Sequence, residues 1–83
     1  MSRRIREIRT ELFVKFLLYI GCEEDLREHQ HKRSGGHRKF NRSGLLRPII
    51  IQAKPDIPVM IIKSNLKTLG ISNEDYLNII EKL

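Results

Sequence analysis

Residues 37–53 read HRKFNRSGLLRPIIIQA, two short segments on either side of a polar turn. The turn, Arg42-Ser43-Gly44, has the residue types that join antiparallel strands. The second segment contains three consecutive β-branched residues, Ile49 to Ile51, which favour a strand. The pattern therefore predicts a hairpin with strands at residues 37–41 and 46–53.

The chain before the hairpin predicts a long helix and one more strand. Between residues 3 and 20, apolar side chains recur every three or four positions, which is the spacing of one helix face, and Gly21 would end that helix. Residues 28–33 are predicted as the first strand of the sheet, joined to the hairpin by Ser34-Gly35-Gly36. For residues 22–27 a loop and a continuation of the helix both remain open.

The chain after the hairpin predicts two more helices. Lys54-Pro55-Asp56 interrupts the sheet, and Pro58 stands where a helix can begin, since its missing N–H would have no partner there. An apolar face follows with helical spacing, and Gly70 ends it. Ser72, followed by Asp75, resembles a capping box and predicts a short terminal helix.

The resulting order is helix, three strands, helix, helix, in one α+β domain over residues 1–83. A chain of this length has room for one compact core. We expect a three-stranded antiparallel sheet with the helices on one face, which leaves the other face to solvent or to a partner. The residues expected in the core are Leu12, Phe16, Leu17, Ile50, Ile62, Leu66 and Leu69.

Charge points to a polyanionic partner. The chain has a formal net charge of +6, and the segment from Lys32 to Arg47 holds six Lys and Arg residues and no acid. Within it, Gly35 and Gly36 precede His37, so that a phosphate can approach both the backbone N–H groups and an imidazole able to move a proton. RNA is the expected partner, with His37 as the candidate catalytic residue. Gly36, Arg38, Lys39, Arg42 and Arg47 are the candidate contacts to its backbone.

The same sequence features also allow simpler structural interpretations. Gly35-Gly36 can be an ordinary hairpin turn with His37 as a solvent-facing strand residue. Cys22, His29 and His31 give a weak signal for zinc, because no paired-ligand motif such as CxxC is present. The arginines at positions 3, 4, 6 and 9 fit either the solvent-exposed face of the first helix or a basic helix that lies on anionic lipid. Residues 23–25 have the composition of a solvated acidic patch.

Several classes are disfavoured by composition. A single cysteine, Cys22, cannot form an internal disulfide, and Arg and Glu interrupt residues 1–11 where a signal peptide would need an apolar core. The longest run without a charged residue starts at Phe16 and stops before Glu23, far short of the roughly 20 residues that span a bilayer. We expect a cytoplasmic protein with no membrane partner.

Residues 35–80 resemble the HicA toxin family, small bacterial mRNA interferases with a fold like that of double-stranded-RNA-binding domains. The likeness begins at Gly35-Gly36-His37-Arg38-Lys39-Phe40, close to the family's Gly-Ser-His, a basic or polar pair, and an aromatic. It continues through Arg47-Pro48-Ile49-Ile50-Ile51 and Asp56-Ile57-Pro58 to the helix ending Gly70-Ile71-Ser72. An acidic pair and an aromatic, Glu74-Asp75-Tyr76, follow as they do in the family.

The chain departs from the family pattern in three places. Gly36 replaces the usual serine beside the histidine, and the stretch from Gly21 to His37 is longer than the family normally has. Where many members carry a second histidine after the third strand, this chain has Gln52-Ala53-Lys54, so that any role of that histidine is absent or passes to Lys54.

The resemblance implies a type II toxin that cleaves mRNA with His37 and needs neither metal nor cofactor. It also implies a HicB-type antitoxin as the protein partner that covers the active site. Two other functions fit the same residues. One is an RNA-binding module without chemistry, and the other is an interaction protein whose basic face binds an acidic partner.

Overall fold

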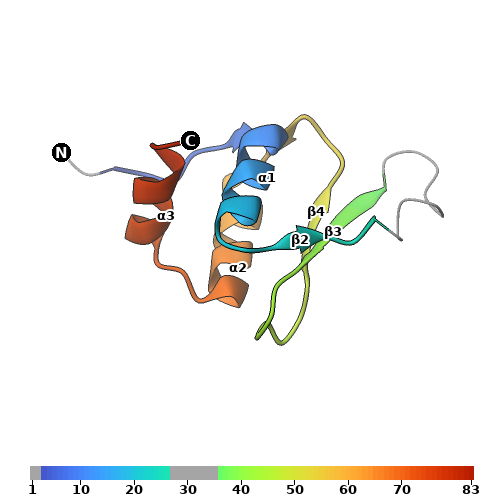
Figure 1. Ribbon diagram of the computed structural model, residues 1–83. Coiled ribbons are helices and arrows are strands. Elements are labelled where there is room, and N and C mark those ends of the chain that lie inside the picture. Colours follow the sequence, from blue (N-terminus) through green and yellow to red (C-terminus); the bar gives the residue numbers. More distant parts are fainter. Residues whose placement is uncertain (1–2, 27–35) are drawn as a thin grey trace.

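A computed structural model describes residues 3–26 and 36–83 (Figure 1). Its elements in chain order are β1 (Ile8–Arg9), α1 (Thr10–Tyr19), β2 (Glu23–Glu24), β3 (His37–Asn41), β4 (Ile49–Gln52), β5 (Asp56–Ile57), α2 (Val59–Leu69) and α3 (Asn73–Ile80). Strands β2, β3 and β4 form an antiparallel sheet in that order, and β1 pairs with β5 in a separate antiparallel ribbon. The predicted α+β class and three-stranded antiparallel sheet are confirmed. The predicted strand at residues 28–33 lies outside the described residues.

The hairpin has one face against the helices and one face away from them. Phe40 lies opposite Ile49 in the β3–β4 register, and both are fully buried. Lys39 lies opposite Ile50, and the Ile50 side chain is 48% exposed. The prediction that Ile50 is a core residue was therefore wrong, because side chains alternate along a strand and the pleat buries its neighbours Ile49 and Ile51 instead.

The first helix is shorter than predicted. It begins at Thr10 rather than near residue 3, because the chain before it is held by β5. The Thr10 amide donates to the Pro55 carbonyl at 2.8 Å, and its hydroxyl donates to the Lys54 carbonyl. The arginines at positions 3, 4, 6 and 9 thus lie outside any helix, which removes the basis for a lipid-binding basic helix.

Strand β2 falls where the sequence left a loop or a helix extension open. Glu23 and Glu24 pair with Asn41 and Phe40 of β3. The Glu24 carboxylate accepts two hydrogen bonds from the Arg38 guanidinium, from Nε and from an Nη, both at 2.8 Å. The side chain of Glu24 is only 15% exposed, so the expectation of a solvated acidic patch was wrong for this residue.

The ends of the two later helices match the sequence signals. Pro58 caps the start of α2, and Gly70 ends it in the left-handed region with φ 72°. The Ser72 hydroxyl accepts a hydrogen bond from the Asp75 amide at 3.1 Å, which caps α3. These signals are local, and for this reason they could be read from a few neighbouring residues.

Figure 1 shows α1 and α2 between α3 and the three-stranded sheet. An aromatic group from α1 and α3 fills the side away from the sheet: Phe16 meets Tyr76 at 4.9 Å between ring centroids with an interplanar angle of 83°. Of the predicted core, Leu12 is half-buried rather than buried. Apart from Leu12 and Ile50, the predicted core residues are confirmed as buried: Phe16, Leu17, Ile62, Leu66 and Leu69.

The Glu24 to Arg38 pair should measurably stabilise the fold. We expect Glu24→Gln to lower the free energy of unfolding by about 1–2 kcal/mol, because the guanidinium would stay half-buried without its carboxylate. Glu11→Gln is the matched control, since the Glu11 carboxylate lies 4.0 Å from Arg38 and its side chain is 78% exposed. Urea unfolding measures both variants, and equal losses would contradict a special role for Glu24.

Tyr76 offers a test of burial. Its hydroxyl is buried with no hydrogen-bond partner among the described residues, and burial raises the pKa of Tyr76 to about 12. Removing the hydroxyl with Tyr76→Phe should stabilise the protein by about 1 kcal/mol at neutral pH. The unfolded tyrosine ionises near pH 10. The parent should therefore lose stability as the pH rises from about 10 to 12, a loss that the variant lacks.

Melting curves at pH 7 and pH 11 distinguish these outcomes. Tyr19→Phe is the control, because the Tyr19 side chain is 58% exposed and its replacement should change neither the neutral stability nor its alkaline decline. If Tyr76→Phe lowers stability at pH 7, the hydroxyl has a partner that the described residues do not supply.

Candidate functional site

His37 begins β3 on the sheet face that the helices leave open. It lies opposite Gln52, and the hairpin is closed beside it by the Ala53 amide, which donates to the Gly36 carbonyl at 3.0 Å. Lys39 and Ile50, one step along the strands, share this face by alternation. The structure therefore groups the His37 imidazole with one of the predicted cations and with an exposed apolar side chain.

A hollow of about 420 Å³ adjoins His37, between β4 and the first turn of α2. Its lining is His37, Ile50, Gln52, Asp56, Ile57, Pro58 and Ile61. The apolar members can receive a flat group such as a base. The imidazole, amide and carboxylate are the groups that can donate, accept or move a proton there.

Arg38 points to the opposite face. Besides its two hydrogen bonds to Glu24, its guanidinium carbon lies 5.7 Å from the centre of the Phe40 ring. The hydrogen bonds that Arg38 donates to Glu24 are the main reason why the pKa of Arg38 is raised, which keeps the guanidinium charged and paired. The structure does not bring Arg38 together with His37.

Arg42 joins the ends of two helices. Its guanidinium donates to the Ile20 carbonyl at 3.3 Å and to the Leu69 carbonyl at 3.5 Å. These oxygens belong to the last turns of α1 and α2, where carbonyls lack partners within the helix. Burial raises the pKa of the neighbouring Cys22 thiol, and the Arg42 charge partly offsets that rise. Cys22 is buried, as expected for a small apolar residue near the core.

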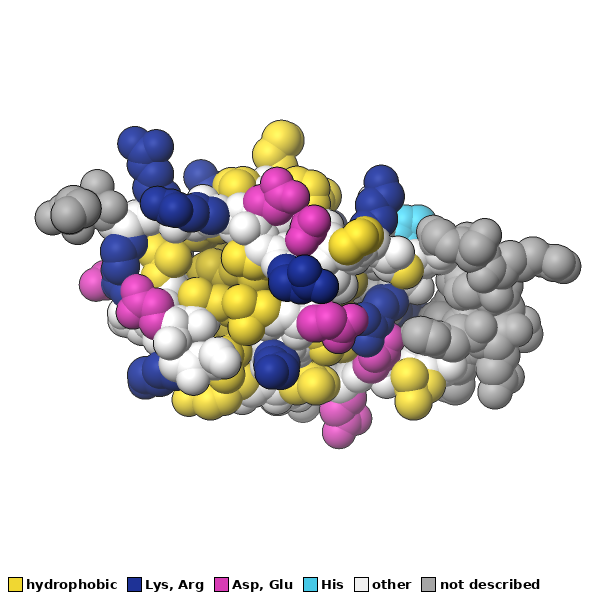
Figure 2. Space-filling view, turned by 90° about the horizontal axis from the view of Figure 1, so that it is seen from above, with side chains coloured by type: hydrophobic (Ala, Val, Ile, Leu, Met, Phe, Trp, Pro, Cys, Tyr) yellow, Lys and Arg dark blue, Asp and Glu magenta, His cyan; other side chains and the backbone are white. Residues whose placement is uncertain are grey.

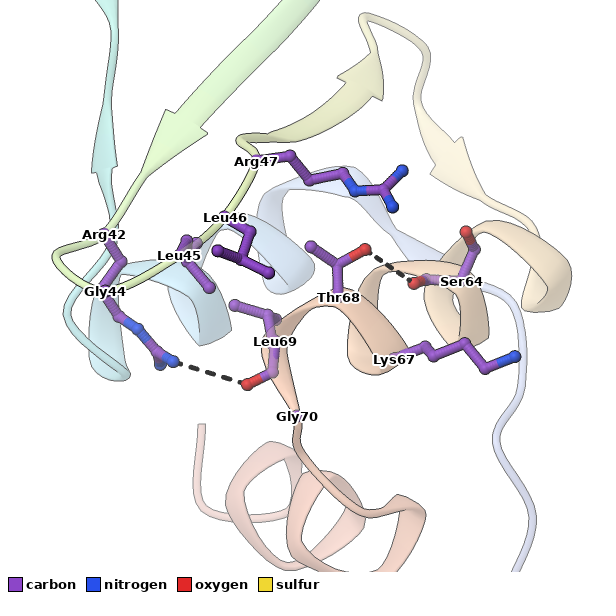
Figure 3. Close-up of a pocket in the computed structure, with 10 residues that line it drawn as sticks. All are labelled: Arg42, Gly44, Leu45, Leu46, Arg47, Ser64, Lys67, Thr68, Leu69 and Gly70. Atoms are coloured by element: carbon purple, nitrogen blue, oxygen red, sulfur yellow. Dashed lines mark hydrogen bonds between the residues drawn. The ribbon is translucent and has the colours of Figure 1, made fainter.

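Arg47 and Lys54 lie apart from His37. Arg47 is exposed in the β3–β4 connection and lines a groove against the second half of α2 (Figure 3). Lys54 is exposed between β4 and β5, and it is not part of the lining of the hollow beside His37. Neither Arg47 nor Lys54 therefore contributes to the lining of the hollow beside His37.

The charges seen from above do not form one basic patch. Figure 2 shows Lys and Arg side chains interspersed with Asp and Glu and with apolar side chains over this face. Among the residues that the structure describes, the cations of the basic segment therefore do not gather around His37.

Sequence reasoning missed two residues of these sites. Asp56 was interpreted as part of a strand break, yet it shares the hollow with His37. Lys67 was not singled out in the sequence, yet it lines the same groove as Arg47. Neither could be found from local spacing, because the residues that they join are far away in the chain.

The described residues contain no cluster of three His, Cys, Asp or Glu side chains suited to a metal ion. His29 and His31, the weak zinc candidates, lie outside residues 3–26 and 36–83. Over those same ranges, none of the helices combines the length and apolar character needed to cross a bilayer.

Comparison with known proteins finds no match. No family model, no curated protein and no solved structure matches it.

Proposed function

We propose that the hollow beside His37 is the active site of a metal-independent endoribonuclease of the HicA type. The observation that carries the proposal is the position of His37, exposed at the start of β3 and sharing a half-apolar hollow with Gln52 and Asp56. The resemblance of residues 35–80 to the HicA toxins supports the same residue. Lys39, which shares this sheet face with His37, supplies a cation for a phosphate chain.

His37 acts as the general base. Its imidazole takes the proton of a ribose 2′-hydroxyl, and the oxygen attacks the adjacent phosphorus. The bond from phosphorus to the 5′ oxygen breaks, which leaves a cyclic phosphate and a 5′-hydroxyl that has taken up a proton from the imidazolium or from water. The apolar side chains of Ile50 and Ile61 hold the base next to the cut and so fix the distance over which the proton moves.

The finer fold belongs to the same proposal. The order α1, β2, β3, β4, α2 follows the helix, three strands, helix order of double-stranded-RNA-binding domains. The β1–β5 ribbon and α3 are additions to that order. The domain over residues 1–83 is then one HicA-like unit.

A HicB-type antitoxin is the proposed protein partner, in a type II toxin–antitoxin pair. Exposed apolar side chains support a protein that covers the hollow: Ile50 and Ile61 of its lining are 48% and 42% exposed, and Met60, which precedes Ile61 in α2, is 80% exposed. Such side chains gain by burial against a partner. The two proteins would act in the cytoplasm, where mRNA is available.

One observation favours the second function, an RNA-binding module without chemistry. Among the described residues no side chain is hydrogen-bonded to the His37 imidazole, whereas a catalytic base is commonly oriented by a third group. The same sheet face would then bind RNA through phosphate and 2′-hydroxyl contacts alone.

Replacing His37 tests the chemistry. We expect His37→Ala to lower the cleavage rate of single-stranded RNA by about 10² to 10⁴, because general-base catalysis contributes that much. Affinity for RNA should change little, since phosphate contacts come from other residues. Activity should persist in EDTA and vanish on RNA methylated at the 2′ oxygens, and new 5′-hydroxyl ends should mark the products.

The outcomes separate the two functions. A folded His37→Ala protein that cuts at the parent rate removes His37 from the mechanism. A parent protein that binds RNA and never cuts it leaves the binding module as the function.

Lys39 and Arg38 make a matched pair for RNA binding. They are neighbours of like charge on opposite faces of β3, and the Lys39 side chain faces away from the helices. Lys39→Ala should flatten the log–log dependence of RNA affinity on salt by about 0.7, the loss of one phosphate contact. Arg38→Ala should mainly lower thermal stability. A larger change in salt dependence for Arg38 would contradict this division.

A further inference from the structure

A second basic site lies away from His37, in the groove between the β3–β4 connection and α2. The groove measures about 520 Å³. Its lining is Arg42, Gly44, Leu45, Leu46, Arg47, Ser64, Lys67, Thr68, Leu69 and Gly70. Three cations and two hydroxyl side chains thus meet in a lining that contains no acid.

Two of the three cations are available to a ligand. Arg42 donates to backbone carbonyls at both helix ends, whereas Arg47 and Lys67 have no hydrogen-bond or ion-pair partner among the described residues. Figure 3 shows the side chains of Arg47 and Lys67 extending on either side of Ser64 and Thr68. The Thr68 hydroxyl donates to the Ser64 carbonyl at 3.4 Å, and the Ser64 hydroxyl remains as a further donor.

The C-terminal end of α2 does not repel an anion in this groove. A helix C-terminus carries a partial negative charge on its free carbonyls, which would repel phosphate. In this chain the Arg42 guanidinium covers the Leu69 carbonyl, and Lys67 stands in the last turn. The local field is therefore set by Arg47 and Lys67.

The groove and the hollow lie at opposite ends of β3. His37 is the first residue of the strand, and Arg42 follows its last residue, Asn41. Five residues of extended chain cover roughly 17 Å. Stacked nucleotides rise about 3.4 Å each, so the span from His37 to the Arg42 end of the groove corresponds to about five nucleotides.

We propose that the groove of Arg47, Lys67 and Ser64 is a phosphate-binding subsite that holds the RNA backbone several nucleotides from the residue at His37. The spacing between this subsite and the cleaved bond rests on the proposed endoribonuclease function. The binding of RNA phosphates in the groove does not depend on cleavage.

Charge-removing variants test the binding. Arg47→Gln and Lys67→Gln each change an exposed side chain, and Lys15→Gln on α1 is the control of equal charge and exposure. Affinity is measured on a fluorescent single-stranded RNA of about ten nucleotides over a salt series. The double variant should weaken binding about tenfold at 0.1 M salt and flatten the log–log slope by about 1.4.

The control decides whether the effect is local. If Lys15→Gln weakens binding as much as Lys67→Gln, the loss reflects overall charge and the subsite is overturned. If both groove variants leave RNA affinity unchanged and weaken only the binding of an acidic protein partner, the groove is a protein-docking site and the proposal is again wrong.

The dependence of cleavage on substrate length gives a second test, because a loss of fold stability would affect long and short substrates equally. On a ten-nucleotide RNA the double variant should raise KM and leave kcat unchanged. On an RNA of two or three nucleotides, too short to reach the groove, parent and variant should be equally efficient. An equal loss of cleavage efficiency on the long and the short RNA would overturn the subsite. If the parent protein cuts neither RNA, the proposed nuclease function is overturned, and the affinity measurements alone then test the subsite.

Discussion

The hydrogen bonds between Arg38 and Glu24 fix which side of β3 faces the helices. Side chains alternate along a strand, so a slip of one residue would exchange the two faces. With Arg38 bound to Glu24 at 2.8 Å and Phe40 fully buried beside it, His37 and Lys39 must lie on the open face. The position of the candidate catalytic residue thus depends in part on an ion pair on the opposite face of the strand.

The cations of the basic segment have two separate uses. Arg38 stabilises the pairing of β2 with β3, and Arg42 binds the carbonyl ends of α1 and α2. Arg47 remains exposed, and it lines a groove together with Lys67, which comes from another part of the chain. The sequence shows that charges are dense here and cannot show which are already paired, because pairing depends on contacts between distant residues.

The same limit decides how much of the fold is predictable. Helix faces such as Phe16, Leu17, Ile62 and Leu66, and the ends at Gly70 and Ser72, follow from local spacing and backbone chemistry and are confirmed. The late start of α1 comes from pairing with β5, and β2 comes from pairing with β3. Ile50 was misplaced because three like residues in a row hide the alternation that the pleat imposes. His37 was predictable as a candidate from its neighbours, whereas Asp56 and Lys67 enter the sites only through the fold.

The position of Asp56 indicates that phosphate binding and the proposed proton transfer use different parts of the surface. Its carboxylate lies in the lining of the hollow with His37, where it opposes the approach of a phosphate. The proposed RNA substrate would therefore be held weakly by the hollow alone, even when the apolar walls accept a base. The attraction must then come from cations outside the hollow, and Lys39 on the same face and the groove at the other end of β3 are placed to supply it.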